Sequence, residues 1–244
     1  MKRLLVGRRP VLEALRASPQ SVAVVYLDPA DKAAARELAE AARRADVRLE
    51  ERSPTELDAL ATGLRHQGVV AITGEFSYLD LDSLLRRLPA ERPLVVALDE
   101  VTDPHNFGAI VRSAVAFGAD GLLTLKHRAA PVTPVVVRAS AGATEHAAIA
   151  RVANLAQSLD LLAERGMDIV GLDMDGDVAI DALDVGPGGL VLVVGSEGRG
   201  LRRLTRERCT RIASIAMAGP IASLNASVAA GIAIHHASLA RARA

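Results

Sequence analysis

Apolar residues along the chain recur in two patterns, and the alternation of these patterns predicts an α/β protein. Continuous aliphatic runs such as VAVVYLD and PLVVALDEV predict buried strands. Between such runs, apolar residues return every three or four positions, as in DKAAARELAEAARRA, which predicts amphipathic helices. Aliphatic strands that alternate with helices are typical of a mostly parallel sheet covered on both faces.

The alternation forms two series, which predict two domains. Residues 1–73 predict a small α/β domain, residues 74–92 a linker with one short helix, and residues 93–244 a larger α/β domain. In the first series, helices are expected at 7–17, 31–45 and 53–62, and strands at 22–28, 47–53 and 68–74. In the second, strands are expected at 93–101, 121–125, 147–152, 167–174, 189–197 and 210–217, and helices at 106–119, 132–141, 154–166 and 199–211, before a long final helix.

Composition narrows the class of protein. Half of the 244 residues are hydrophobic, yet only 2% are aromatic, so stacking on nucleic-acid bases has few candidate side chains. A single cysteine, Cys209, excludes an internal disulfide and fits a reducing cytoplasm. No apolar stretch has the length of a membrane span. These features predict a cytoplasmic protein that does not enter a membrane.

Charge is balanced overall but unevenly distributed. The formal net charge is zero, whereas residues 173–184 contain five Asp and residues 199–211 contain six Arg against one Glu. Two interpretations of the arginine-rich segment are open. It is either a solvated helix face or a local phosphate-binding patch.

Polar, glycine-bearing turns follow three expected strands of the second domain. These turns begin the segments TDPHNFGAIVR, SEGRGL and AGPIASLNAS. Ligands of open α/β sheets bind outside the carboxyl ends of the strands, so three such turns at one sheet edge predict a site. Each turn alone also has a structural explanation, because Asn and Ser commonly cap helices.

Several chemistries are excluded by spacing. GSEGRG reads G-x-x-G-x-G and occurs late in the chain, so it is not a dinucleotide-binding fingerprint. The chain contains no G-x-x-x-x-G-K-[ST] loop, and its six His and one Cys match no zinc spacing. The sequence therefore predicts no metal site.

Three segments resemble, in order, the motifs of the SpoU/TrmH ribose methyltransferases, which belong to the SPOUT superfamily. They are NFGAIVRSA at 106–114, VVGSEGRGL at 193–201 and IAMAGPIASLNASVA at 215–229. The resemblance extends over residues 93–234 and includes K-x-R at 126–128 and S-A-G-A-x-E at 140–145. With the first domain ending in HQGVVA, the chain is most similar to the RlmB-type branch, which methylates a guanosine of large-subunit rRNA. We therefore expect methylation of a guanosine ribose 2′-hydroxyl in the peptidyl-transferase region.

The resemblance also implies a fold and partners. The second domain would form a deep trefoil knot, in which the final helix threads a loop, and the first would be an L30e-like RNA-binding module. The cofactor would be S-adenosylmethionine, without a metal, and the protein a homodimer on ribosomal RNA. Methylation of tRNA, methylation of another rRNA site and a non-catalytic RNA-binding role are the alternatives.

Site residues carry over by position. Because a guanidinium stays protonated near neutral pH, Arg112 is expected to clamp a phosphate and stabilise negative charge on the ribose oxygen, oriented by Asn106 and Glu197. The expected catalytic residues are Arg112, Asn106, Glu197, Ser223 and Asn225. The expected cofactor-binding residues are Gly195, Ile215, Met217, Gly219, Leu224 and Ser227. The expected RNA-binding residues are Arg8, Arg9, His66, Lys126 and Arg128.

The chain departs from the family pattern at three positions. Ala216 stands where proline is usual, and Ala226 where valine is usual. Both changes are small and apolar, so they alter packing without removing a functional group. His127 replaces a common acid between Lys126 and Arg128, which affects the expected RNA contacts.

Overall fold

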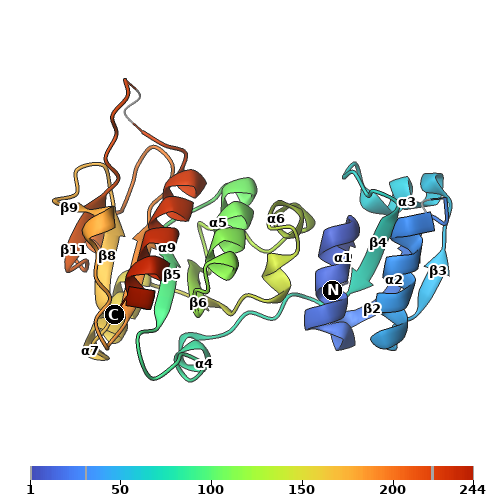
Figure 1. The fold of residues 1–244 in the computed structure, drawn as a ribbon, viewed down its shortest axis with the longest axis horizontal. Helices are drawn as coiled ribbons and strands as arrows, with labels where there is room; N and C mark the ends of the chain where they lie inside the picture. Colours follow the sequence, from blue (N-terminus) through green and yellow to red (C-terminus); the bar gives the residue numbers. More distant parts are fainter. Residues whose placement is uncertain (1, 31, 221–222, 244) are drawn as a thin grey trace. The chain divides into compact units, whose positions relative to one another are not determined.

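The structure, a computed structural model, describes residues 2–30, 32–220 and 223–243. Figure 1 traces the chain through its helices and strands, and the expected α/β architecture is confirmed. Contacts divide the chain into two compact units. The first runs to Ser77 and includes Pro131–His146, and the second comprises Tyr78–Ala130 and the chain from Ala147 onward.

The first unit is built on a mixed four-stranded sheet of order β1-β4-β2-β3. Its strands are β1 (Arg3–Val6), β2 (Val22–Leu27), β3 (Leu49–Glu51) and β4 (Val69–Thr73), and its helices are α1 (Arg8–Ala17), α2 (Lys32–Arg44), α3 (Pro54–Ala61) and α6 (Pro134–Ala139). Strand β1 was not expected, because its four residues are too few to show a pattern. Asp31, at which the second helix was expected to start, lies outside the described residues.

The second unit contains a seven-stranded sheet of order β7-β6-β5-β10-β8-β11-β9, in which every pair is parallel. Its strands are β5 (Leu94–Leu98), β6 (Gly121–Leu125), β7 (Ile149–Val152), β8 (Asp168–Leu172), β9 (Val178–Ala179), β10 (Leu190–Val194) and β11 (Arg211–Ser214). Its helices are α4 (Leu81–Leu85), α5 (Pro104–Ala116), α7 (Leu155–Glu164), α8 (Arg203–Arg206) and α9 (Ala226–Arg243).

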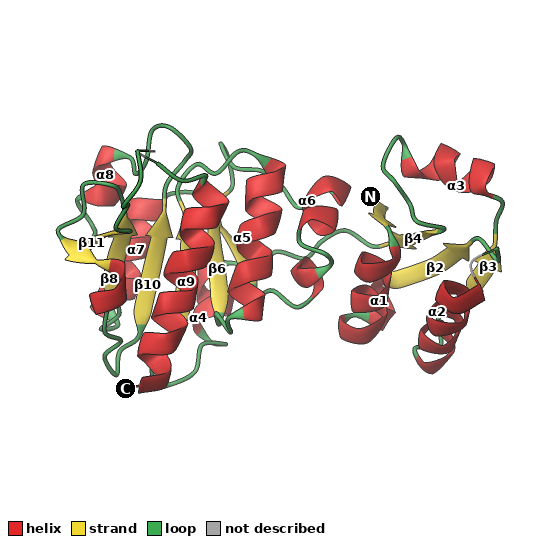
Figure 2. Ribbon diagram, turned by 45° about the horizontal axis from the view of Figure 1, so that its top comes forward, coloured by secondary structure: helices red, strands yellow, loops and turns green. Residues whose placement is uncertain are grey.

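Helices cover the second sheet as the continuous aliphatic strands require. Helices α5 and α9 lie side by side over one face of the sheet, as Figure 2 shows. Residues of α4 and α7 pack with alternate strand residues in one hydrophobic cluster on the other face. Strands β5 and β10 are buried over their whole length. This rigid central pair carries the turns that form the candidate site.

The arginine-rich segment 199–211 is not the single helix expected from its sequence. Its helical part, α8, is only four residues long. A tight hairpin precedes it, and Gly200 adopts a positive φ of 64° there. Arg202 is then extended, with φ −63° and ψ 149°, because both its backbone and its side chain bond to Asp99. A tertiary contact therefore overrides the local helical preference.

Among the residues that the structure describes, no helix is both long and apolar enough to span a membrane.

Candidate active site

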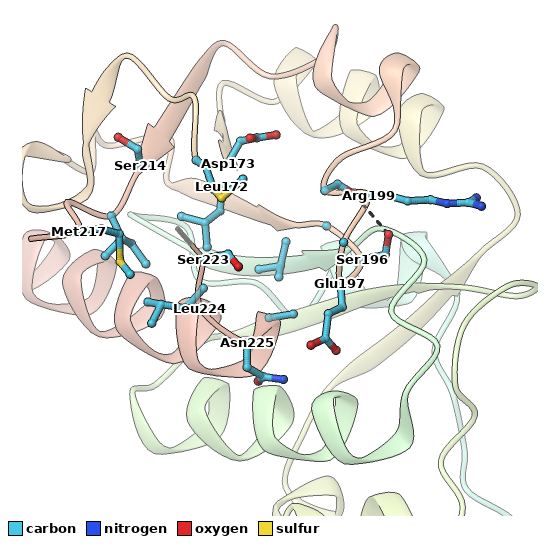
Figure 3. A pocket seen from close by; sticks show the side chains of 18 of the residues that line it. Leu172, Asp173, Ser196, Glu197, Arg199, Ser214, Met217, Ser223, Leu224 and Asn225 are labelled. Carbon is cyan, nitrogen blue, oxygen red and sulfur yellow. Dashed lines mark hydrogen bonds between the residues drawn. The ribbon is translucent and has the colours of Figure 1, made fainter. Parts of the chain in front are cut away.

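The loops that follow β5, β10 and β11 meet at the carboxyl edge of the second sheet. They do so because β5 and β10 are neighbours and only β8 separates β10 from β11. A cavity of about 780 Å³ opens there, lined by the loops after β8, β10 and β11 and by the start of α9 (Figure 3).

A chain of side-chain hydrogen bonds joins the three sequence motifs. The amide nitrogen Nδ2 of Asn106 donates to Oε2 of Glu197 at 3.0 Å, and Oδ1 of Asn106 accepts from Nδ2 of Asn225 at 3.0 Å. Asn106 is only 8% exposed, so both of its polar ends need these partners. Three residues far apart in sequence are thus fixed in one geometry.

Asn106 itself is positioned by the start of α5. Asp103 is the N-cap of this helix, and its Oδ1 accepts from the backbone N–H of Asn106 at 2.7 Å. Pro104 occupies the first turn, where a missing N–H costs nothing. Asn106 is therefore not the cap of the helix. Its side chain is free to bridge the other two motifs.

Asn225 combines a structural and a site role. Its Oδ1 accepts from the backbone N–H of Ser227 at 3.0 Å and from the Ser227 hydroxyl at 2.6 Å, which satisfies the N-terminus of α9. Its Nδ2 meanwhile donates to Asn106. The polar joint before the final helix is thus a helix cap and a bridge to the first motif.

Glu197 lies on a hairpin whose two ends, at Gly195 and Gly200, approach each other closely. Ser196 and Gly200 exchange backbone hydrogen bonds of 3.1 and 3.0 Å. At the base of the hairpin, a Cβ on Gly195 would lie 2.3 Å from the carbonyl carbon of Gly200. Only glycine therefore allows the two backbones to approach this closely beside the cavity.

The hairpin is anchored by Asp99, a residue that sequence reasoning did not select. Asp99 is 0% exposed and follows β5 directly. Its Oδ1 accepts from Nε of Arg202 at 2.6 Å, and its Oδ2 accepts from the Arg202 backbone N–H at 2.9 Å. Burying a carboxylate without a partner is costly, so an acid directly after an all-aliphatic strand could have indicated a specific partner for Asp99.

Four of the six expected cofactor residues line the cavity, namely Gly195, Ile215, Met217 and Leu224. Gly219 and Ser227 are not among its lining residues. The catalytic candidates Glu197, Ser223 and Asn225 also line it, and so do Ala216 and Ala226, the two small departures from the family pattern. Leu172, Asp173 and Ser214 were not expected from the sequence.

Arg112 lies apart from the hydrogen-bonded chain. It is exposed on α5, and it forms no hydrogen bond or ion pair with any residue that the structure describes. Six residues correspond to about 120° around a helix, so Arg112 and Asn106 occupy different faces. The amide of Asn106 bonds to Glu197 and Asn225, and neither Asn106 nor Glu197 contacts Arg112 through a hydrogen bond within the described residues, so the expected orientation of Arg112 by these two residues stays a prediction.

The expected RNA-binding residues differ in how free their side chains are. Arg8 is paired with Glu37, His66 Nε2 lies 3.1 Å from Asp58 Oδ1, and Arg128 pairs with Glu100 at 3.3 Å. Arg9 and Lys126 are exposed and have no side-chain hydrogen bond or close ion pair within the described part of the chain.

Two further chemistries find no support among the residues that the structure describes. Burial raises the pKa of the Cys209 thiol to about 11, so this group stays protonated near neutral pH and is a poor nucleophile. Within residues 2–30, 32–220 and 223–243, no cluster of three or more His, Cys, Asp or Glu side chains is arranged to hold a metal ion.

Comparisons with known proteins agree with this geometry. Residues 93–235 match the model of the SpoU rRNA Methylase family, and residues 4–79 match that of the RNA 2′-O ribose methyltransferase substrate-binding domain. A Mycolicibacterium vanbaalenii protein described as an uncharacterized tRNA/rRNA methyltransferase is 43% identical over 243 residues, covering 98% of this chain and 76% of its own.

Solved structures show the same likeness. The SpoU methyltransferase AviRb from Streptomyces viridochromogenes, in complex with AdoMet, has a TM-score of 0.80 at 31% identity, covering 100% of this chain and 92% of its own. An AdoMet-bound rRNA methyltransferase from Sinorhizobium meliloti has a TM-score of 0.79 at 26% identity, covering 97% of this chain and 86% of its own. With both regions matched and the three motifs joined at one sheet edge, the chain belongs to the SpoU rRNA methylase family.

Proposed function

We propose that this protein transfers the methyl group of S-adenosylmethionine to the ribose 2′-hydroxyl of a guanosine in the peptidyl-transferase region of large-subunit rRNA. Membership of the SpoU family supports the reaction class, which is RNA 2′-O-ribose methylation. The choice of rRNA and of guanosine rests on the sequence resemblance to the RlmB-type branch. The observation that carries the proposal most directly is the Glu197–Asn106–Asn225 chain, which unites all three motifs beside one cavity.

The cavity fits S-adenosylmethionine by the chemistry of its lining. Aliphatic side chains of Ile215 and Leu224 offer apolar walls, and the close approach of Gly195 to Gly200 leaves backbone groups beside the cavity. Such sites bind ligands through main-chain N–H and C=O groups. When bound, the cofactor supplies an electrophilic methyl group on a sulfonium, and this chemistry needs no metal.

The protein's own residues hold the reactants and stabilise charge. Transfer to a hydroxyl is an in-line displacement, so much of the acceleration comes from positioning. Asn106, Glu197 and Asn225 fix the two loops that border the cavity, with Ser223 exposed beside them. Arg112 clamps an RNA phosphate and stabilises the negative charge that develops on the ribose oxygen. An arginine side chain leans toward the helix N-terminus, which is the end of α5 nearest the cavity.

The first unit captures RNA in this proposal. Arg9 offers a free guanidinium, and Arg8 and His66 would exchange their intramolecular acids for phosphates. Lys126 and Arg128 add contacts from the loop after β6. The domain boundaries 1–73 and 93–244, the trefoil knot formed by the final helix and a cytoplasmic location belong to the same proposal.

We expect the protein to be a homodimer. A shallow groove between α5 and α9, lined by Ala109, Ser113, Phe117, Ser227, Val228, Gly231, Ile232 and His235, is largely apolar, and Val228 is 50% exposed. Burial of such a surface favours self-association. Light scattering at micromolar concentration should give twice the 25.6 kDa chain mass, and Val228→Asp should halve it. A monomeric wild-type protein would contradict this expectation.

A direct assay tests the proposed reaction. We expect the full chain to bind S-adenosylmethionine with the same calorimetric Kd in buffer with and without EDTA. It should then label unmodified large-subunit rRNA with methyl groups recovered as 2′-O-methylguanosine. Chelator-sensitive cofactor binding would contradict the metal-free site. Label in unmodified tRNA instead of rRNA would favour tRNA methylation. Cofactor binding without transfer to any RNA would favour a non-catalytic RNA-binding role.

A further inference from the structure

The arginine-rich segment leaves one guanidinium without an acidic partner. Five of its six arginines form ion pairs: Arg202 with Asp99 and Glu100, Arg203 with Glu207, Arg206 with Asp173, Arg208 with Asp160, and Arg211 with Asp168 and Asp184. Arg199 is exposed and has no hydrogen bond or ion pair with a residue in the described ranges. The segment as a whole is therefore neutralised by the chain's own acids, and Arg199 is the exception within it.

Arg199 is placed at the cavity by the same hairpin that carries Glu197. The two residues flank Gly198, whose φ of 80° forms the turn, and all three line the cavity. Figure 3 shows the two side chains diverging, with Glu197 directed toward Asn225 and Arg199 directed away from both. The neighbouring acid consequently does not neutralise the arginine.

The backbone that presents Arg199 is already fixed. The backbones of Ser196 and Gly200 are hydrogen-bonded across the hairpin. Two residues after Gly200, both the side chain and the backbone N–H of Arg202 donate to Asp99. A partner of Arg199 therefore needs to immobilise only the side chain, which lowers the entropic cost of binding.

Neither acid that lines the cavity pairs with Arg199, so its guanidinium is left to bind an anionic ligand. The acids that line the cavity, Glu197 and Asp173, are engaged by Asn106 and Arg206. We propose that Arg199 binds a backbone phosphate of the RNA strand whose ribose reaches the cavity, an inference that rests on the proposed function. The planar guanidinium matches a phosphate with two parallel N–H donors.

A matched pair of variants tests this contact. Arg199→Ala and Arg203→Ala each remove one exposed arginine of the same segment, and Arg203 is 76% exposed with a single surface ion pair. We would measure filter binding of unmodified large-subunit rRNA transcript from about 0.05 to 0.3 M KCl. One lost phosphate contact should lower the slope of log K against log salt by about 0.7–0.9, and weaken binding about fivefold near 0.15 M.

The expected result is that Arg199→Ala shows both changes, that Arg203→Ala shows neither, and that Arg199→Lys keeps the wild-type slope. Equal losses in the two alanine variants would overturn the proposal, as would a weaker calorimetric Kd for S-adenosylmethionine in Arg199→Ala. Because RNA binding is the readout, a wild-type protein that binds rRNA but transfers no methyl group would contradict only the proposed reaction.

Discussion

Arg112→Ala is expected to reduce methyl transfer by about 10²–10³-fold, the usual cost of losing one well-placed charge stabiliser. The melting temperature and the Kd for S-adenosylmethionine should stay close to wild type, because Arg112 is exposed and has no partner in the described part of the chain. Single-turnover rates with rRNA, thermal melting and calorimetry measure the three quantities.

Arg165→Ala is the matched control for this variant. Arg165 is also an exposed arginine of the second unit, but it is the C-cap of α7, at the end of the helix that leads back to the amino edge of the sheet. Its removal should leave the rate unchanged. Arg112→Lys should restore little activity, because lysine lacks the two-pronged donor geometry. A lysine variant close to wild type would show that a point charge is sufficient, and a large loss of stability in Arg112→Ala would indicate a structural role.

Asn106→Asp is expected to have the second large effect, because it reverses one hydrogen bond of the motif chain. The aspartate would place a carboxylate oxygen where Nδ2 now donates to Glu197 at 3.0 Å. The carboxylates of residue 106, which is buried, and Glu197 would then face each other with no hydrogen-bond donor between them. The unmet acceptors should cost about 1–3 kcal/mol of folding free energy. Displacement of Glu197 should lower methyl transfer by at least about 100-fold, since loss of positioning carries such a penalty.

A second substitution should repair this variant. In Asn106→Asp combined with Glu197→Gln, the glutamine amide can donate to the introduced carboxylate, which still accepts from Asn225. We expect the double variant to recover most of the lost stability, and more activity than Asn106→Asp alone. Wild type, the single variants Asn106→Asp and Glu197→Gln, and the double variant form a thermodynamic cycle, measured by denaturant unfolding and by methyl transfer. Additive losses would show that Asn106 and Glu197 act independently.

The sequence by itself determined the fold class and the position of the candidate site. Aliphatic runs such as 94–98 and 190–194 can be buried on both faces only in a sheet covered by helices, so the alternation predicted the parallel sheet correctly. Parallel strands bring their carboxyl ends to one edge, and this rule alone placed the three polar turns together. Cap residues were readable for the same local reason, since Asn225 satisfies backbone groups only two residues away.

Only the tertiary structure determined the contacts between segments that are distant in the sequence. Asp99 and Arg202 are 103 residues apart, and their bond converts an arginine-rich stretch that looks helical into a hairpin and a single helical turn. The ion pairs of this stretch also determine which arginine remains free. Hydrophobic periodicity reports local burial, whereas the partner of a charged or amide side chain depends on the folded path of the whole chain. For that reason the sequence could name Asn106, Glu197 and Arg112 but could not show that the first two bond to each other and the third does not.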